Sequence, residues 1–291
     1  MKKAGLLFAF ALMIGCSGES EVDYPYFKFV FRSESLNPVQ LRSNSSRLYF
    51  LDSGTGQVWS IDPDEGYQAE RVGPMGYAFD VSESQMAVAS FSGENRVDVY
   101  DLSGNIKESA IIHGQAPLRP RFGPDGKLFV ARLDSGDGGP LLEYDPDSGS
   151  FDTVLTWVCQ EFCVSSDAVF YYDPDAEKVV KFSLVDSSTS SFWTGKPGMP
   201  DAFLHQVCLD VSRDGSQLLV SPLLILDTRT GVQTPLHSTP YDRGTELEGS
   251  VAWQTNNQAI YFNAMEIESG DSSDAESYSY PWTIWLYMNP E

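Results

Sequence analysis

The segment PRFGPDGKLFVAR, residues 120–132, decides the fold of this chain. It is typical of a short strand, a turn built on Pro, Asp and Gly, and a second, more apolar strand. Five other segments have this pattern, and the starts of the six lie 40, 41, 42, 47 and 42 residues apart. The six segments begin at Val39, Phe79, Pro120, Phe162, Leu209 and Val251.

Most of these segments are followed by a third and a fourth alternating strand, as in LLEYD (141–145) and FDTVLTWV (151–158). Four antiparallel strands repeated every ~40–45 residues predict an all-β chain, a β-propeller with four-stranded blades. The last unit has only three strands, and the alternating stretch YFKFVFR (26–32) can supply its outer strand. We therefore expect a single domain over residues 26–291 with six blades, and seven as the alternative if one repeat has diverged.

Two of the repeats carry a resemblance to known proteins. GPDGKLFVAR (123–132) and SRDGSQLLVS (212–221) resemble the turn-plus-strand unit of TolB-type and YVTN/NHL-type (WD40-like) propeller repeats. The resemblance covers about residues 26–291 and implies the propeller fold. Such repeats occur in hydrolases, lyases, sensors and scaffolds, so the fold alone does not determine the function.

The N-terminus is typical of a targeting segment. Lys2 and Lys3 precede the apolar run AGLLFAFALMIG (4–15), which is too short to span the ~30 Å hydrocarbon core of a membrane. Gly15 directly precedes Cys16, and this junction resembles a bacterial lipobox. The resemblance implies a signal peptide over residues 1–15, acylation of Cys16 with palmitate or a similar chain, and a polar tether over 16–25. A plain secretory signal is the alternative.

The expected location is therefore the bacterial cell envelope, lipid-anchored, at the outer membrane facing the periplasm or at the cell surface. The chain carries 41 Asp and Glu against 19 Lys and Arg, a formal net charge of −22. This charge disfavours nucleic acid and anionic lipid as partners, so membrane contact is expected through the lipid anchor only. A monomer is the expected state.

No cofactor is expected, and a divalent cation attracted by the acidic surface is the alternative. The acidic turn YDPDSG (144–149) does not continue as an EF-hand, because the twelfth position from Asp145 is Thr156 rather than Glu. It is more typical of a hairpin between the third and fourth strands of a blade.

The first strand of each unit places a set of residues toward the central channel. One parity of these strands is apolar, and the intervening positions are Gln40, Asp80, Arg121, Cys163, Asp210 and Ala252. Buried charges are costly unless they are paired or functional. We therefore interpret Asp80, Arg121 and Asp210 as candidate binding residues, with structural pairing across the channel as the alternative.

Two further candidate groups belong to the face that carries the crossings between blades. His113, His205 and His237 lie at such crossings and are candidates for acid–base or zinc chemistry, or are unrelated loop residues. The long acidic loop at 263–282 includes Glu266, Glu268 and Asp271 and is a candidate docking strip, or a solvated loop.

Three cysteines remain after Cys16, and an oxidising compartment permits one disulfide among them. Cys159–Cys163 requires a turn between the two residues, and Cys163–Cys208 would join neighbouring inner strands. Both pairings stay open.

Two functions follow. The first is a membrane-anchored, non-catalytic propeller that binds an envelope protein, peptide or glycan through its loop-rich face. The absence of GxSxG, HExxH and P-loop motifs favours it. The alternative is a periplasmic hydrolase or lyase, in the style of lactonases or streptogramin lyases, that uses His and carboxylate groups at the channel mouth.

Overall fold

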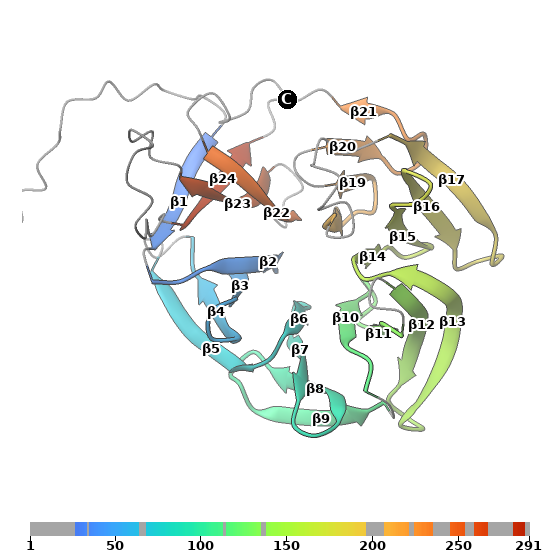
Figure 1. The fold of residues 1–291 in the computed structure, drawn as a ribbon, viewed down its shortest axis with the longest axis horizontal. Helices are drawn as coiled ribbons and strands as arrows, with labels where there is room; N and C mark the ends of the chain where they lie inside the picture. The colour runs from blue at the N-terminus through green and yellow to red at the C-terminus, as the bar shows by residue number, and fades with distance from the viewer. Residues whose placement is uncertain are drawn as a thin grey trace, which may run out of the picture.

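The computed structural model describes residues 27–33, 35–63, 68–112, 115–134, 138–195, 207–220, 224–234, 245–253, 259–266 and 282–288. These residues form six four-stranded antiparallel sheets arranged as the blades of a ring, and they contain no helix (Figure 1). The all-β, six-bladed prediction is confirmed. No helix in the described ranges is long and apolar enough to cross a membrane.

The strands follow one order in every blade from the axis outward. Blade 1 comprises β2 (Pro38–Ser43), β3 (Leu48–Asp52), β4 (Gln57–Ile61) and β5 (Ala69–Met75). Blade 2 comprises β6 (Ala78–Val81), β7 (Gln85–Phe91), β8 (Asn95–Asp101) and β9 (Ile106–Ile111). Blade 3 comprises β10 (Leu118–Phe122), β11 (Leu128–Arg132), β12 (Gly138–Asp145) and β13 (Ser150–Cys159).

The remaining blades repeat this order. Blade 4 comprises β14 (Phe162–Val164), β15 (Ala168–Asp173), β16 (Lys178–Ser183) and β17 (Thr189–Thr194). Blade 5 comprises β18 (Leu209–Val211), β19 (Gln217–Val220), β20 (Leu224–Asp227) and β21 (Gln233–Thr234). Blade 6 comprises β22 (Thr245–Trp253), β23 (Ala259–Glu266), β24 (Trp282–Met288) and, outermost, β1 (Phe27–Ser33).

The ring closes through the two ends of the domain. β1 pairs antiparallel with β24, with Phe27 opposite Tyr287 and Ser33 opposite Trp282. The expectation that residues 26–32 complete the last blade is therefore confirmed. Buried apolar side chains of blades 1 and 6, including Phe50 and Tyr261, pack in one cluster at this junction.

Burial changes with distance from the axis, because each blade is covered on both faces by its neighbours. β3 is buried at all five positions, and β15 at five of six, which explains the continuous apolar runs in these second strands. The outer strands β5 and β17 are mostly exposed or half-buried. The core therefore lies between blades, as in the cluster that joins Phe129, Phe170 and Leu218 of blades 3, 4 and 5.

The acidic turn at residues 145–149 is a hairpin between β12 and β13, as predicted. The amide of Gly149 donates to the carbonyl of Asp145 at 2.9 Å, and the amide of Asp147 donates to the Asp145 carboxylate at 3.0 Å. Gly149 has a φ of 66°, a conformation that glycine adopts without steric cost. The Asp145 carboxylate therefore stabilises its own turn.

Candidate functional site

The six innermost strands bring one residue each to an equivalent place around the central channel, here called the ring position. In blades 2 to 5 the ring position lies two residues before the residue whose amide hydrogen bond closes the turn after the first strand. In blade 2, for example, Asp80 lies two residues before Ser82. In blade 6 the ring position directly precedes Trp253. The Trp253 amide donates to Asp210 of blade 5, just as the Phe122 amide of blade 3 donates to Asp80 of blade 2. The six ring positions are Arg42, Asp80, Arg121, Cys163, Asp210 and Ala252.

The sequence predicts Gln40 among the inner-strand residues that face the channel. That prediction is wrong in blade 1, where Arg42 rather than Gln40 occupies the ring position. The register of β2 against β3 shifts between Val39 and Arg42, so one extra residue is inserted there. Gln40 adopts a φ of 53°, and its side chain bonds Tyr77 O and Phe79 N of the next blade instead. A β-bulge of this kind reverses the alternation of the residues that follow it.

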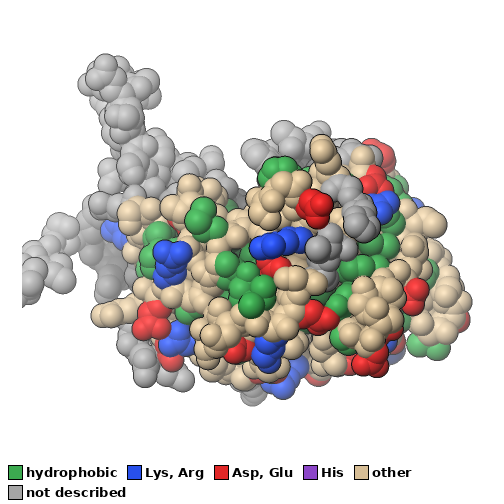
Figure 2. Space-filling view, turned by 90° about the horizontal axis from the view of Figure 1, so that it is seen from below, with side chains coloured by type: hydrophobic (Ala, Val, Ile, Leu, Met, Phe, Trp, Pro, Cys, Tyr) green, Lys and Arg blue, Asp and Glu red, His purple; other side chains and the backbone are tan. Residues whose placement is uncertain are grey.

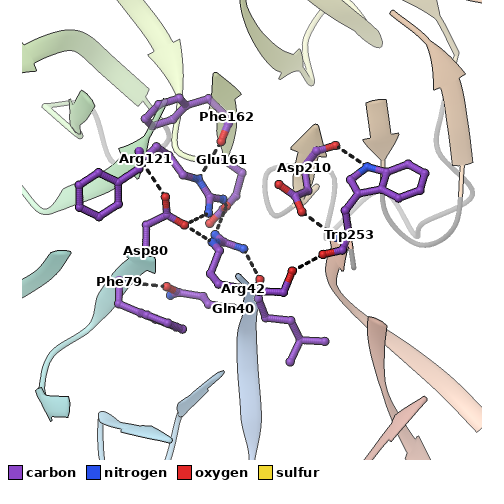
Figure 3. A network of polar contacts seen from close by, with 12 residues as sticks. Gln40, Arg42, Phe79, Asp80, Arg121, Glu161, Phe162, Asp210 and Trp253 are labelled. Atoms are coloured by element: carbon purple, nitrogen blue, oxygen red, sulfur yellow. Dashed lines mark hydrogen bonds and ion pairs between the residues drawn. The ribbon is translucent and has the colours of Figure 1, made fainter. Parts of the chain in front are cut away.

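Arg121 is the centre of a buried charged network that joins three blades (Figure 3). Its guanidinium donates from Nη2 to Glu161 Oε2 at 2.8 Å, from Nε to the carbonyl of Phe162 at 2.8 Å, and from Nη1 to Asp80 Oδ1 at 3.4 Å. Arg42 adds a second guanidinium, with Nε 2.9 Å from Asp80 Oδ1 and Nη2 3.8 Å from Glu161 Oε2. Two arginines and two carboxylates thereby neutralise one another inside the ring.

Asp210 lies apart from this network, beside Trp253 (Figure 3). Its Oδ2 accepts the amide of Trp253 at 2.8 Å, its Oδ1 accepts the amide of Val211 at 3.1 Å, and the Trp253 indole donates to its carbonyl at 3.3 Å. Asp80 makes the same link from blade 2 to blade 3, because its Oδ2 accepts the amide of Phe122 at 2.6 Å. Each aspartate therefore joins its blade to the next.

Burial has the largest effect on the acidity of these groups. It raises the pKa of Asp210 to about 6, while the amide of Trp253 and the charge of Arg42 oppose the rise. The pKa of Asp80 is also raised by burial, against the influence of Arg42 and the amide of Phe122. Burial, with nearby Asp210, raises the pKa of the Cys163 thiol. Cys163 is consequently a neutral member of the ring at pH 7.

A pocket of about 430 Å³ opens over the ring. Its floor includes Arg42, Asp80, Arg121, Cys163 and Asp210, and its mouth is formed by the turns between the first and second strands of blades 1 to 5. The pocket therefore lies on the face opposite the blade crossings. That differs from the face that the histidines and the long loop had indicated.

An ion pair spans the mouth of this pocket. Arg213 Nη1, in the first turn of blade 5, lies 3.2 Å from Glu83 Oε1, in the first turn of blade 2. Blades 2 and 5 are three steps apart in the ring in either direction, so the pair joins opposite sides of the opening (Figure 1). Glu83 also accepts a hydrogen bond from the Ser45 hydroxyl of blade 1 at 2.5 Å. Both ion-pair partners are about half exposed.

The structure brings together all three candidate residues that were proposed from the inner strands, Asp80, Arg121 and Asp210. It adds Arg42, hidden from sequence reasoning by the bulge, and Glu161, which directly precedes β14 and has no pattern to mark it. The other candidates are not tested. Cys16, His113, His205, His237, Glu268 and Asp271 lie outside the described residues, as does the side chain of Glu266 at the end of β23.

Cys159, Cys163 and Cys208 are all buried. They are present as thiols, with no disulfide among these three described residues. The two pairings therefore stay predictions for the oxidised protein.

The side of the disc seen in Figure 2 is mixed in charge. In the edge-on view of the disc, acidic, basic and apolar side chains are interspersed (Figure 2). The net charge of −22 therefore does not make this edge uniformly acidic.

Comparison with known proteins identifies the fold. A crystal structure of regucalcin, a calcium-binding protein from Agrobacterium tumefaciens, is similar with a TM-score of 0.58 and 13% identity, over 90% of this chain and 96% of that one. TolB from Acinetobacter baumannii matches with a TM-score of 0.49 and 16% identity, over 90% and 64% of the two chains. The Cps50 (Swd1) propeller domain of Myceliophthora thermophila matches with a TM-score of 0.48 and 12% identity, over 86% and 83%.

No family model and no curated protein sequence matches the chain. The similarity to regucalcin therefore supports the β-propeller fold alone.

Proposed function

We propose that this protein is a lipid-anchored propeller of the bacterial envelope that binds a protein, peptide or glycan and performs no catalysis. One observation carries the non-catalytic part. The charged residues at the centre of the ring join the blades to one another. A single side chain, that of Arg121, contacts Asp80 of blade 2, Phe162 of blade 4 and Glu161 between blades 3 and 4. Buried charges that are satisfied by one another are typical of structural pairing rather than of a reaction centre.

The anchor is supported by the junction of the apolar run 4–15 with Cys16. The test is metabolic labelling with radioactive palmitate, followed by fractionation of the envelope. The wild-type chain is expected to carry the label and to sediment with membranes. Cys16→Ala is expected to lose the label, and an unlabelled wild-type chain would contradict the anchor.

The partner is expected to bind the loop-rich face, where the acidic segment 263–282 favours a basic surface on the partner. The test is crosslinking in intact cells followed by purification of the protein. The variant Glu266→Gln/Glu268→Gln/Asp271→Asn is expected to lose captured partners. The matched control, Asp147→Asn/Asp152→Asn/Asp175→Asn, removes the same charge from exposed positions elsewhere. Equal capture by both variants would contradict a docking role for this segment.

A hydrolase or lyase is the second candidate, and Asp210 is the observation that favours it. A carboxyl group whose pKa is raised to about 6 in a pocket is suited to proton transfer near neutral pH. His113, His205 and His237 belong to crossings on the opposite face, so in this proposal they supply acid–base groups to a separate site there, with or without a divalent cation such as the calcium that regucalcin binds. A screen of lactones and esters with and without Ca²⁺ tests it, and a wild-type chain without turnover would exclude it for those substrates.

A further inference from the structure

We propose that the pocket over the ring is a binding site for a small organic cation, an amine whose ammonium group pairs with the Asp210 carboxylate. The site goes beyond the proposed function, because it lies on the face opposite the docking loops and takes a small molecule rather than a macromolecule.

The charges that line the pocket favour a cation. Five carboxylates and three guanidiniums line it. Arg42 and Arg121 both contact Asp80, and Arg213 contacts Glu83 at the mouth. The contacts of Asp210 are with backbone amides, which carry no net charge. Arg42 also acts on Asp210 electrostatically, but five carboxylates against three guanidiniums leave the lining as a whole with an excess of negative charge.

The walls beside Asp210 suit the organic part of such a ligand. Trp253 lies beside Asp210, because its amide and its indole both donate to Asp210, and Phe122 lines the same pocket on the side of blade 3. Aromatic rings attract ammonium groups, and a volume of about 430 Å³ is in the range of small-molecule sites.

A metal ion fits the same residues less well. Among the described residues, no group of three or more His, Cys, Asp or Glu side chains converges as metal ligands do. An ammonium group needs only one carboxylate and a few polar acceptors. The chemistry of the pocket therefore points to an amine.

The ion pair at the mouth gives such a ligand a way in. Arg213 and Glu83 are exposed, and exposed pairs of this kind are weak. An incoming ammonium group can replace Arg213 as the partner of Glu83. Arg213 thus competes with the ligand, and its removal is expected to tighten binding.

The test is isothermal titration calorimetry with the diamine putrescine as the probe. Its uncharged isostere 1,4-butanediol and MgCl₂ serve as ligand controls. The wild-type protein is expected to bind putrescine, and 1,4-butanediol is expected not to bind. Asp210→Asn should weaken the binding at least about tenfold, because a charge-assisted contact is lost. The matched control Asp152→Asn, exposed on β13, should bind as the wild type does.

Several results would overturn the proposal. These are no putrescine binding by folded wild-type protein, equal binding by Asp210→Asn, or displacement of putrescine by equal concentrations of Mg²⁺. If Asp210→Asn does not fold, Arg213→Gln decides, because its affinity should rise severalfold and an unchanged or lower affinity contradicts the proposal. Palmitate labelling and partner capture do not depend on this pocket, so they can succeed when it fails.

Discussion

Asp80 and Asp210 occupy the same ring position in opposite blades and make the same link to the next blade, yet their surroundings differ. Each accepts the backbone amide of the residue after the next ring position, Phe122 for Asp80 and Trp253 for Asp210. Asp80 also lies between the guanidiniums of Arg42 and Arg121. Both carboxylates line the same pocket, but Asp210 has Trp253 rather than a guanidinium as its hydrogen-bonding partner.

The same aspartate-to-amide hydrogen bond joins two pairs of blades, yet within the described part of the chain only in one of them does a guanidinium also neutralise the carboxylate by direct contact. The other carboxylate is therefore available to bind a ligand. On the side of blades 1 to 4, charge is neutralised within the protein. On the side of blades 5 and 6, the carboxylate is held by amides and its charge faces the pocket. Substitutions on the two sides should therefore have effects of different size and of different kind.

The largest effect is expected where the network is broken. Arg121→Leu should lower the free energy of unfolding by about 3 kcal/mol or more, because it leaves Glu161 buried without its closest guanidinium. Urea unfolding at neutral pH measures this. The matched control is Arg119→Leu in the same strand, which removes one bond to the carbonyl of Tyr77 and should cost about 1 kcal/mol. Equal losses for the two variants would show that Arg121 is not the centre of the network.

A smaller effect, with a distinct pH dependence, is expected at Asp210. Its folded-state pKa of about 6 exceeds the ordinary value of 3.8, so its stabilising contribution is present below about pH 4 and is lost as the pH rises through about 6. The stability of Asp210→Asn relative to the wild type should therefore increase by about 1 kcal/mol between pH 5 and pH 8.

The charged and titratable groups that influence Asp210 from neighbouring strands are Arg42, Asp80 and Cys163. Burial raises the pKa of Asp80 to about 7, and removing the Asp210 charge lowers that pKa, so the difference from the wild type reports Asp210 together with its coupling to Asp80. Unfolding curves of both proteins at several pH values make the measurement, with Asp152→Asn as the reference. If the free energies of unfolding of the wild type and Asp210→Asn change equally with pH across this range, Asp210 behaves as an exposed aspartate does and the prediction is wrong.

The smallest effect is expected at the mouth of the pocket. The coupling between Arg213 and Glu83 should be about 0.5 kcal/mol or less, because both side chains are exposed. A double-mutant cycle with Arg213→Ala and Glu83→Ala measures it, and added salt should reduce it further. A coupling as large as that of the buried network would mean that the mouth is closed in the resting protein.

The sequence predicted most of the fold because the signals for it are local. Strand alternation, turn residues and near-constant spacing gave the six blades, and parity placed Asp80, Arg121, Cys163 and Asp210 correctly. Parity failed at Gln40 because a bulge is a backbone feature, and the residues around it do not mark it. Glu161 was missed because it lies before its strand, where alternation makes no statement.

The face of the pocket could not be predicted for a different reason. The polar turns at its mouth, such as Ser82–Ser84 and Ser212–Gly215, have residues that are ordinary in any surface turn. Their convergence around a channel depends on the packing of blades that are far apart in the sequence.

The pairing of β1 with β24 sets an order on the assembly of the protein. The first strand of the domain to be synthesised finds its hydrogen-bonding partner only when the last strand has emerged. Until then blade 6 lacks its outer strand, and the hydrogen bonds that close the ring are not yet made. If Cys16 carries a lipid, any force on that anchor reaches the domain through β1, so a mechanical pull would peel the ring open at the seam that closed last.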